Sequence, residues 1–161
     1  MPSMMESREH RALFNPAAVS VVLARQCQGS RQRGRTQIPL TIALAGSLIA
    51  FHPRARLILP GNVGANFVTW LEREPQVKVD VAASLRGSSH WLRQGLAFAL
   101  SNNVCAWIGP ASLAIGDAAP EDKISGHSEM AEIQRSAYFL GRWLPEAGTE
   151  ATVLALLGMR P

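Results

Sequence analysis

The chain has 161 residues, a formal net charge of +4 and 47% hydrophobic residues. This length and this apolar share predict one globular domain and exclude disorder of the whole chain. Charged residues make up only 17%, below the roughly 25% usual in soluble proteins, which suggests that a partner covers part of the surface.

The first predicted helix begins at the N-cap Asn15, with Pro16 in its first turn, and ends near Gly29. A basic loop with glycine near both ends follows over residues 29–37. Pro39 then opens a second helix, residues 40–51, which is apolar nearly all round and is therefore expected at the centre of the fold. His52 and Pro53 end that helix.

A third helix, capped by Asn62, runs to Pro75 with one apolar face. Fourth and fifth helices are predicted over 78–86 and 90–100, with a break at Gly87-Ser88-Ser89 between them. Two short apolar runs, 104–108 and 111–115, flank a Gly-Pro turn and predict a β-hairpin. This order of elements is that of a winged helix-turn-helix, whose exposed recognition residues would be Arg86, His90, Arg93 and Gln94.

A polar, acidic stretch follows the hairpin and is predicted to be a linker or mobile loop. Helices are then expected over 129–144 and, capped by Thr149, over 150–157. The predicted fold class is mainly α, in a single domain that spans residues 1–161. Its parts are an N-terminal helical part (11–75), a winged-helix-like helix-helix-hairpin part (76–116), the acidic loop (117–128) and C-terminal helices (129–161).

Positive charge is concentrated in the first part of the chain. Residues 1–60 contain eight arginines and two glutamates, a balance of +6, whereas residues 61–161 balance to −2. Arginine makes bidentate contacts to phosphate, so Arg31, Arg33 and Arg35 in the basic loop are candidate nucleic-acid contacts. The sequence favours the simpler interpretation, a solvated basic surface that arises from the codon bias of a GC-rich genome.

Neither a membrane nor a secretory location is expected. The N-terminus lacks the apolar segment of a signal peptide, and the longest apolar run, residues 38–51, is shorter than the ~20 residues that cross a bilayer. Cys27 and Cys105 stand far apart, so the sequence offers neither a disulfide framework nor a zinc-binding pair. We expect a cytoplasmic protein without cofactors.

Catalytic motifs are missing from the sequence. Neither lysine follows a glycine, as a phosphate-binding P-loop requires, and the four histidines are scattered. Asp117, Glu121 and Lys123 resemble a metal-dependent nuclease set, but they crowd into one polar loop, which favours a solvated loop. The four tryptophans lie in apolar patterns typical of packing.

An ordered series of motifs carries a family resemblance. It comprises Arg11-Ala-Leu-Phe-Asn-Pro-Ala, the apolar helix ending in His52, the segment from Arg54 to Leu59-Pro60, Thr69-Trp70-Leu71, Phe139-Leu-Gly-Arg-Trp-Leu and Leu156-Leu-Gly-Met-Arg-Pro161. In this order, from about residue 11 to the end, the chain resembles the middle component of bacterial three-component ABC (ABC-3C) systems.

The resemblance implies a non-enzymatic adaptor that couples an ABC-type ATPase to a variable third component in prokaryotic conflict, such as anti-phage defence. The family assigns no catalytic residues, and none are carried over. Candidate partner-docking residues are Arg54, Arg142, Trp143 and Arg160. The alternative hypothesis is a winged-helix regulator that binds nucleic acid.

Overall fold

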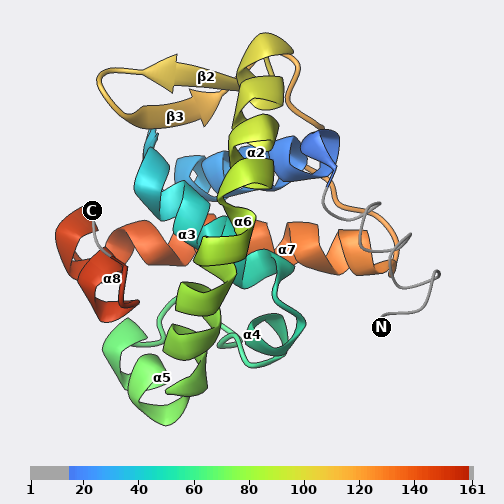
Figure 1. Cartoon of the computed structure of the whole chain (residues 1–161). Coiled ribbons are helices and arrows are strands. Elements are labelled where there is room, and N and C mark those ends of the chain that lie inside the picture. Colours follow the sequence, from blue (N-terminus) through green and yellow to red (C-terminus); the bar gives the residue numbers. More distant parts are fainter. Residues whose placement is uncertain (1–14, 160–161) are drawn as a thin grey trace.

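The computed structural model describes residues 15–159, and helices dominate it (Figure 1). The elements in chain order are α2 (Pro16–Gln32), β1 (Ile38–Pro39), α3 (Leu40–Phe51), α4 (Pro53–Leu57), α5 (Phe67–Arg73), α6 (Gln76–Ser101), β2 (Cys105–Ile108), β3 (Ser112–Ile115), α7 (Glu129–Trp143), a 3-10 turn (Leu144–Glu146) and α8 (Glu150–Leu156). The predicted mainly α fold class is confirmed.

Short polar side chains cap the N-termini of several helices, two of them at the predicted positions. The Asn15 carboxamide oxygen accepts a hydrogen bond from the Ala18 N–H at 2.8 Å, and Pro16 fills the first turn of α2. The Thr149 hydroxyl accepts in the same way from the Thr152 N–H at 3.2 Å. The cap of the third predicted helix is wrong by one turn: Asn66, and not Asn62, accepts from Thr69 and begins α5.

The predicted break at Gly87-Ser88-Ser89 is wrong, because α6 runs through it without interruption. Its buried residues form one stripe at helical spacing, and Ser88 occupies a buried position in that stripe; the set is Val77, Val81, Ser88, Leu92, Gly95 and Ala99. A glycine inside a helix costs about 1 kcal/mol, which packing along such a stripe readily offsets. The helix-turn-helix of a winged helix is therefore not formed.

Helix α2 lies at the centre of the molecule, and all its residues from Ala18 to Ser30 except the half-buried Val21 are buried. It packs between α7 and α6, and α3 also contacts it (Figure 1). The crossing with α7 is close: a Cβ added to Gly29 would collide with the Tyr138 carbonyl oxygen, and one added to Gly141 with the Gln26 carbonyl oxygen. The predicted basic loop begins later than expected, because α2 continues to Gln32.

The predicted hairpin is confirmed as β2 and β3, which pair antiparallel with Trp107 opposite Leu113. A third strand, β1, was not predicted. It pairs with β3 through Ile38 opposite Leu113, so the sheet order is β1-β3-β2. The hairpin projects from the helical body, with β2 on its outer side (Figure 1).

Candidate interaction surfaces

The three arginines predicted to contact nucleic acid lie at the C-terminal end of α2. Arg31 is in the last turn, Arg33 is the C-cap and Arg35 follows it, and all three side chains are exposed. Two of them are already paired with carboxylates. Arg31 lies 3.1 Å from Asp122, and Arg33 lies 2.8 Å from Glu146.

These ion pairs change what the arginines offer to a ligand. The hydrogen bond from Arg33 lowers the pKa of Glu146, so that carboxylate stays ionised at neutral pH and neutralises part of the local charge. A phosphate would have to compete with two carboxylates of the chain itself. Contact with nucleic acid at this site stays a prediction.

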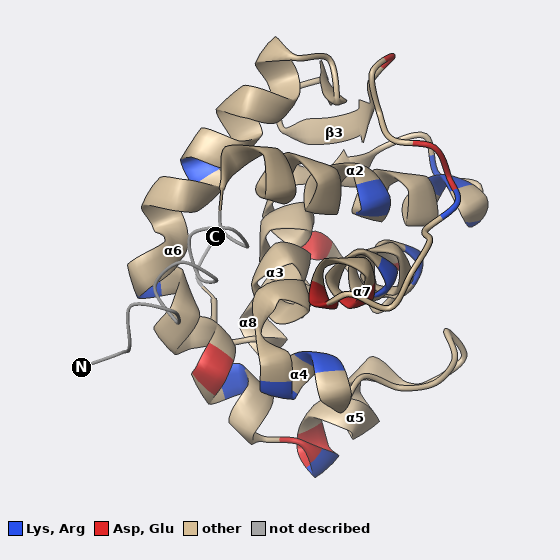
Figure 2. Ribbon diagram, turned by 90° about the vertical axis from the view of Figure 1, so that its right-hand side faces the viewer, with Lys and Arg blue, Asp and Glu red and all other residues tan. Residues whose placement is uncertain are grey.

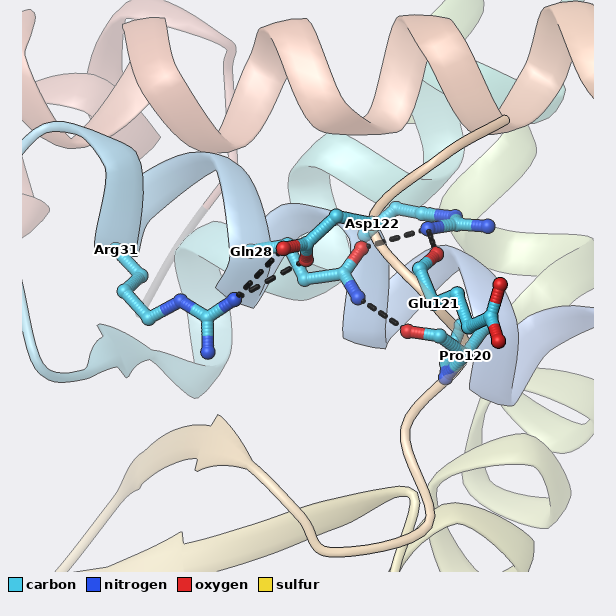
Figure 3. A network of polar contacts seen from close by, with 6 residues as sticks. Gln28, Arg31, Pro120, Glu121 and Asp122 are labelled. Atoms are coloured by element: carbon cyan, nitrogen blue, oxygen red, sulfur yellow. Dashed lines mark hydrogen bonds and ion pairs between the residues drawn. The ribbon is translucent and has the colours of Figure 1, made fainter. Parts of the chain in front are cut away.

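The acidic loop (residues 117–128) has neither helix nor strand, as predicted, but its middle is fixed to α2 (Figure 3). The Gln28 side-chain amide donates to the Pro120 carbonyl at 2.7 Å, and the Arg25 guanidinium donates to the Glu121 carbonyl. Arg25 is only 4% exposed and also donates to the Gln28 and Gln134 side-chain oxygens at 2.8 and 2.9 Å. Burial lowers the pKa of Arg25, an effect that the carboxylate of Asp122 opposes.

The three residues of the nuclease hypothesis lie on this loop with their side chains exposed; they are Asp117, Glu121 and Lys123. Glu121 contacts Arg25 through its backbone carbonyl and not through its carboxylate. Among residues 15–159, no three side chains of metal-ligating type gather into a group that could hold an ion.

The candidate docking residues fall into different environments. Arg54 is exposed on α4. Arg142 is half-buried, and its guanidinium lies 5.9 Å from the centre of the Tyr138 ring. Arg160 lies outside the described residues.

The docking role predicted for Trp143 is wrong, because this side chain is 2% exposed. Its ring packs edge-on against Phe67 and Trp70, each at 5.3 Å between ring centres, and its indole N–H donates to the Ala65 carbonyl at 2.8 Å. Trp143 therefore joins α7 to α5 in the core. Its burial, with that of Trp70, confirms the prediction of packing for these two tryptophans.

The two cysteines meet in the core between α2 and β2. Cys27 and Cys105 are 4% and 2% exposed, and their thiols are hydrogen-bonded to each other. This hydrogen bond and burial raise the pKa of Cys27 well above its ordinary value. The Cys27 thiol is therefore protonated at neutral pH and is a poor nucleophile.

The residues that sequence reasoning missed lie at the tip of the hairpin. All of residues 107–111, named here the hairpin tip, are exposed, with Trp107 at 45% and Ile108 at 39%. A signal was present in the sequence: residues 94–116, which include the whole hairpin, contain no charged side chain. Figure 2 shows β3 without a charged residue, whereas α2 and α7 both carry charged residues. Large apolar side chains at an uncharged surface are typical of protein contact sites.

The residues proposed for the recognition helix of a winged helix lie on the exposed surface of α6; they are Arg86, His90, Arg93 and Gln94. Because α6 is continuous, they belong to one long helix and not to a helix that follows a turn. Within the described part of the chain, none of the helices has the length and apolar character needed to span a bilayer.

The fold and these surfaces define a small, mainly α protein with an uncharged hairpin on its surface. The family model described as "ABC-three component (ABC-3C) system Middle Component 3" matches residues 4–161. The chain therefore belongs to this family of middle components of ABC-3C systems. No curated protein and no solved structure gives a significant match.

Proposed function

We propose that this chain is a non-catalytic adaptor subunit that couples the ABC ATPase of its system to the variable third component. The observation that carries the proposal is the family match over residues 4–161. The middle component of a multi-protein system must contact other components. In this proposal the chain works in the cytoplasm and takes part in prokaryotic conflict, such as anti-phage defence.

The distribution of surface chemistry supports a role with more than one contact. The hairpin tip is uncharged and carries Trp107 and Ile108, whereas the end of α2 and the acidic loop carry the paired charges of Arg31 and Asp122. Interface cores are depleted in charge and enriched in aromatic residues, whereas rims are polar. Two surfaces of different chemistry suit two different neighbours.

The experiment is co-expression of the tagged chain with the ATPase and the third component encoded beside it, followed by affinity capture at low salt. We expect both proteins to be recovered in fixed proportion with the chain. A monomeric chain that retains neither protein would contradict the adaptor function. Recovery of nucleic acid alone, released by added salt, would also contradict it, because phosphate contacts weaken steeply with salt.

A further inference from the structure

We propose that the N-terminal segment of this chain docks onto the chain's own helices, with Phe14 in an apolar groove between α3 and α6. Phe14 directly precedes the described residues. The groove has a volume of about 320 Å³. The residues that line it are mainly apolar and include Leu48, Phe51, Ala83, Gly87 and Trp91.

Two aromatic side chains determine what this groove accepts. The rings of Phe51 and Trp91 meet edge-on, with 5.3 Å between their centres. Among the described residues, none of those that line the groove is a lysine, arginine, aspartate or glutamate. A further aromatic ring would add apolar contact and edge-to-face packing there, whereas a charged side chain would lose its hydration without gaining an ionic partner.

The way α2 begins directs Phe14 towards α6. Asn15 is the N-cap, and its side chain accepts a hydrogen bond from the Ala18 N–H. When a helix is capped in this way, an apolar residue just before the cap often packs on the fourth residue of the helix, an arrangement called a hydrophobic staple. In this chain the two positions hold Phe14 and Val19, and both residues are apolar as the staple requires.

Val19 lies against α6 beside the groove. A Cβ added to Gly95 would collide with the Val19 side chain, so α2 and α6 touch at this point, where the two helices cross (Figure 1). Trp91 precedes Gly95 by one helical turn, about 5.4 Å along α6. A phenylalanine ring packed on Val19 is therefore within reach of Trp91 without any long connecting segment.

The chain's own segment suits this groove better than a second copy or another component does. Phe14 is joined directly to Asn15, so it stays beside the groove and acts at a high effective concentration. A second copy could place the same residue there only by exchange, which also costs the freedom of a whole molecule. The family model matches residues 4–161, so the segment and the groove belong to the same family unit.

The size of the groove agrees with such an occupant. Its volume is at the lower end of the roughly 300–1,000 Å³ of small-molecule sites, so it accepts a few side chains and not the surface of a folded partner.

The test is a double-mutant cycle in the full chain. Phe14→Ala and Trp91→Ala are made alone and together, and urea denaturation gives the equilibrium constant for folding. In the control cycle Phe98→Ala replaces Trp91→Ala, because Phe98 is on the same helix but is 36% exposed and does not line the groove. In the unaltered chain, NMR measures nuclear Overhauser effects between the rings of Phe14 and Trp91. A mixture of labelled and unlabelled chains separates contacts within a chain from contacts between chains.

We expect Phe14→Ala to lower the equilibrium constant for folding by about tenfold or more. The effect should be about threefold smaller in the Trp91→Ala background, and unchanged in the Phe98→Ala background. The Overhauser effects between the two rings should arise within a single chain, and this measurement decides alone if Trp91→Ala does not fold.

Additive effects of Phe14→Ala and Trp91→Ala, or no Overhauser effect between the rings, would overturn the proposal. Overhauser effects between chains would also overturn it, because the groove would then hold the segment of a second copy. None of these measurements needs another component, so either result leaves the adaptor function to its own test.

Discussion

Two glycines decide how closely the central helix approaches its main neighbour. Gly29 of α2 faces the backbone of Tyr138, and Gly141 of α7 faces the backbone of Gln26. In both cases the atom that a Cβ would meet belongs to the main chain, which cannot rotate away as a side chain can. The absence of a side chain at these residues is therefore a condition for the packing of α2 against α7.

Gly141→Ala should lower the free energy of unfolding by roughly 3 kcal/mol, at the upper end of the effects of overpacking a core. Its helical backbone would favour alanine by about 1 kcal/mol, so a large loss isolates the steric conflict. The measurement is urea denaturation followed by circular dichroism. Gly61→Ala is the matched control, because nothing lies within 4 Å of a Cβ there. If Gly141→Ala were as stable as the unaltered chain, α2 and α7 would have to lie farther apart than the structure places them.

Individual residues were predictable where their role is local. Asn15 and Thr149 were correctly assigned as caps, because a cap depends on hydrogen bonds within three residues of the chain. Trp143 and Trp107 stand in similar apolar surroundings in the sequence, yet one is buried and the other exposed. Trp143 is buried because it packs against α5, which is far away in sequence. The residues next to each tryptophan therefore do not reveal which of the two is buried.

At the scale of elements, α6 shows how tertiary contacts overrule a local signal. Gly87, Ser88 and Ser89 favour a helix break by intrinsic propensity. The buried stripe nevertheless continues through Ser88 from Val81 to Leu92, and its spacing stays helical. Strand β1 shows the opposite effect, because a strand forms where the sequence gives no signal for one. Its two residues are too few to show an alternation of apolar and polar side chains, and they pair with β3 more than 70 positions later. A partner so distant in sequence leaves no local pattern.

Gly87→Ala should raise the free energy of unfolding by about 0.5–1 kcal/mol, because alanine is the better residue inside a continuous helix. The residue is exposed, and a Cβ there meets nothing within 4 Å. Thermal and urea denaturation measure the change. If a break existed at this position, the substitution would leave stability unchanged or reduce it, and the helix-turn-helix hypothesis would return.

For the whole molecule, the position of α2 determines where stability is concentrated. Helices α3, α6 and α7 and all three strands contact α2, whereas α8 contacts α3 at one end of the molecule. The charged groups at the end of α2 find partners far along the chain: Asp122 is 91 positions from Arg31, and Glu146 is 113 positions from Arg33. Neither pairing follows from the sequence, and both reduce the charge that a phosphate ligand would meet.

Amide hydrogen exchange should therefore be slowest in α2, between Val19 and Ser30, and fastest in α5 and α8. Amides in a helix that is buried over most of its length exchange only when much of the structure opens, whereas short peripheral helices open locally. Exchange measured residue by residue by NMR at neutral pH checks this order. Slower exchange in α8 than in α2 would contradict this prediction, because α2 would then not be the most stable part of the fold.

The exposed hairpin tip has a consequence for how much of this protein a cell can tolerate. A copy made in excess of its partner proteins would keep the uncharged hairpin tip, with the half-exposed Trp107 and Ile108, in contact with water, and such exposed apolar surface promotes aggregation. Such an orphan copy is a natural substrate for chaperones and proteases. Balanced synthesis with the other components would remove this hazard, and an altered gene dosage would expose it.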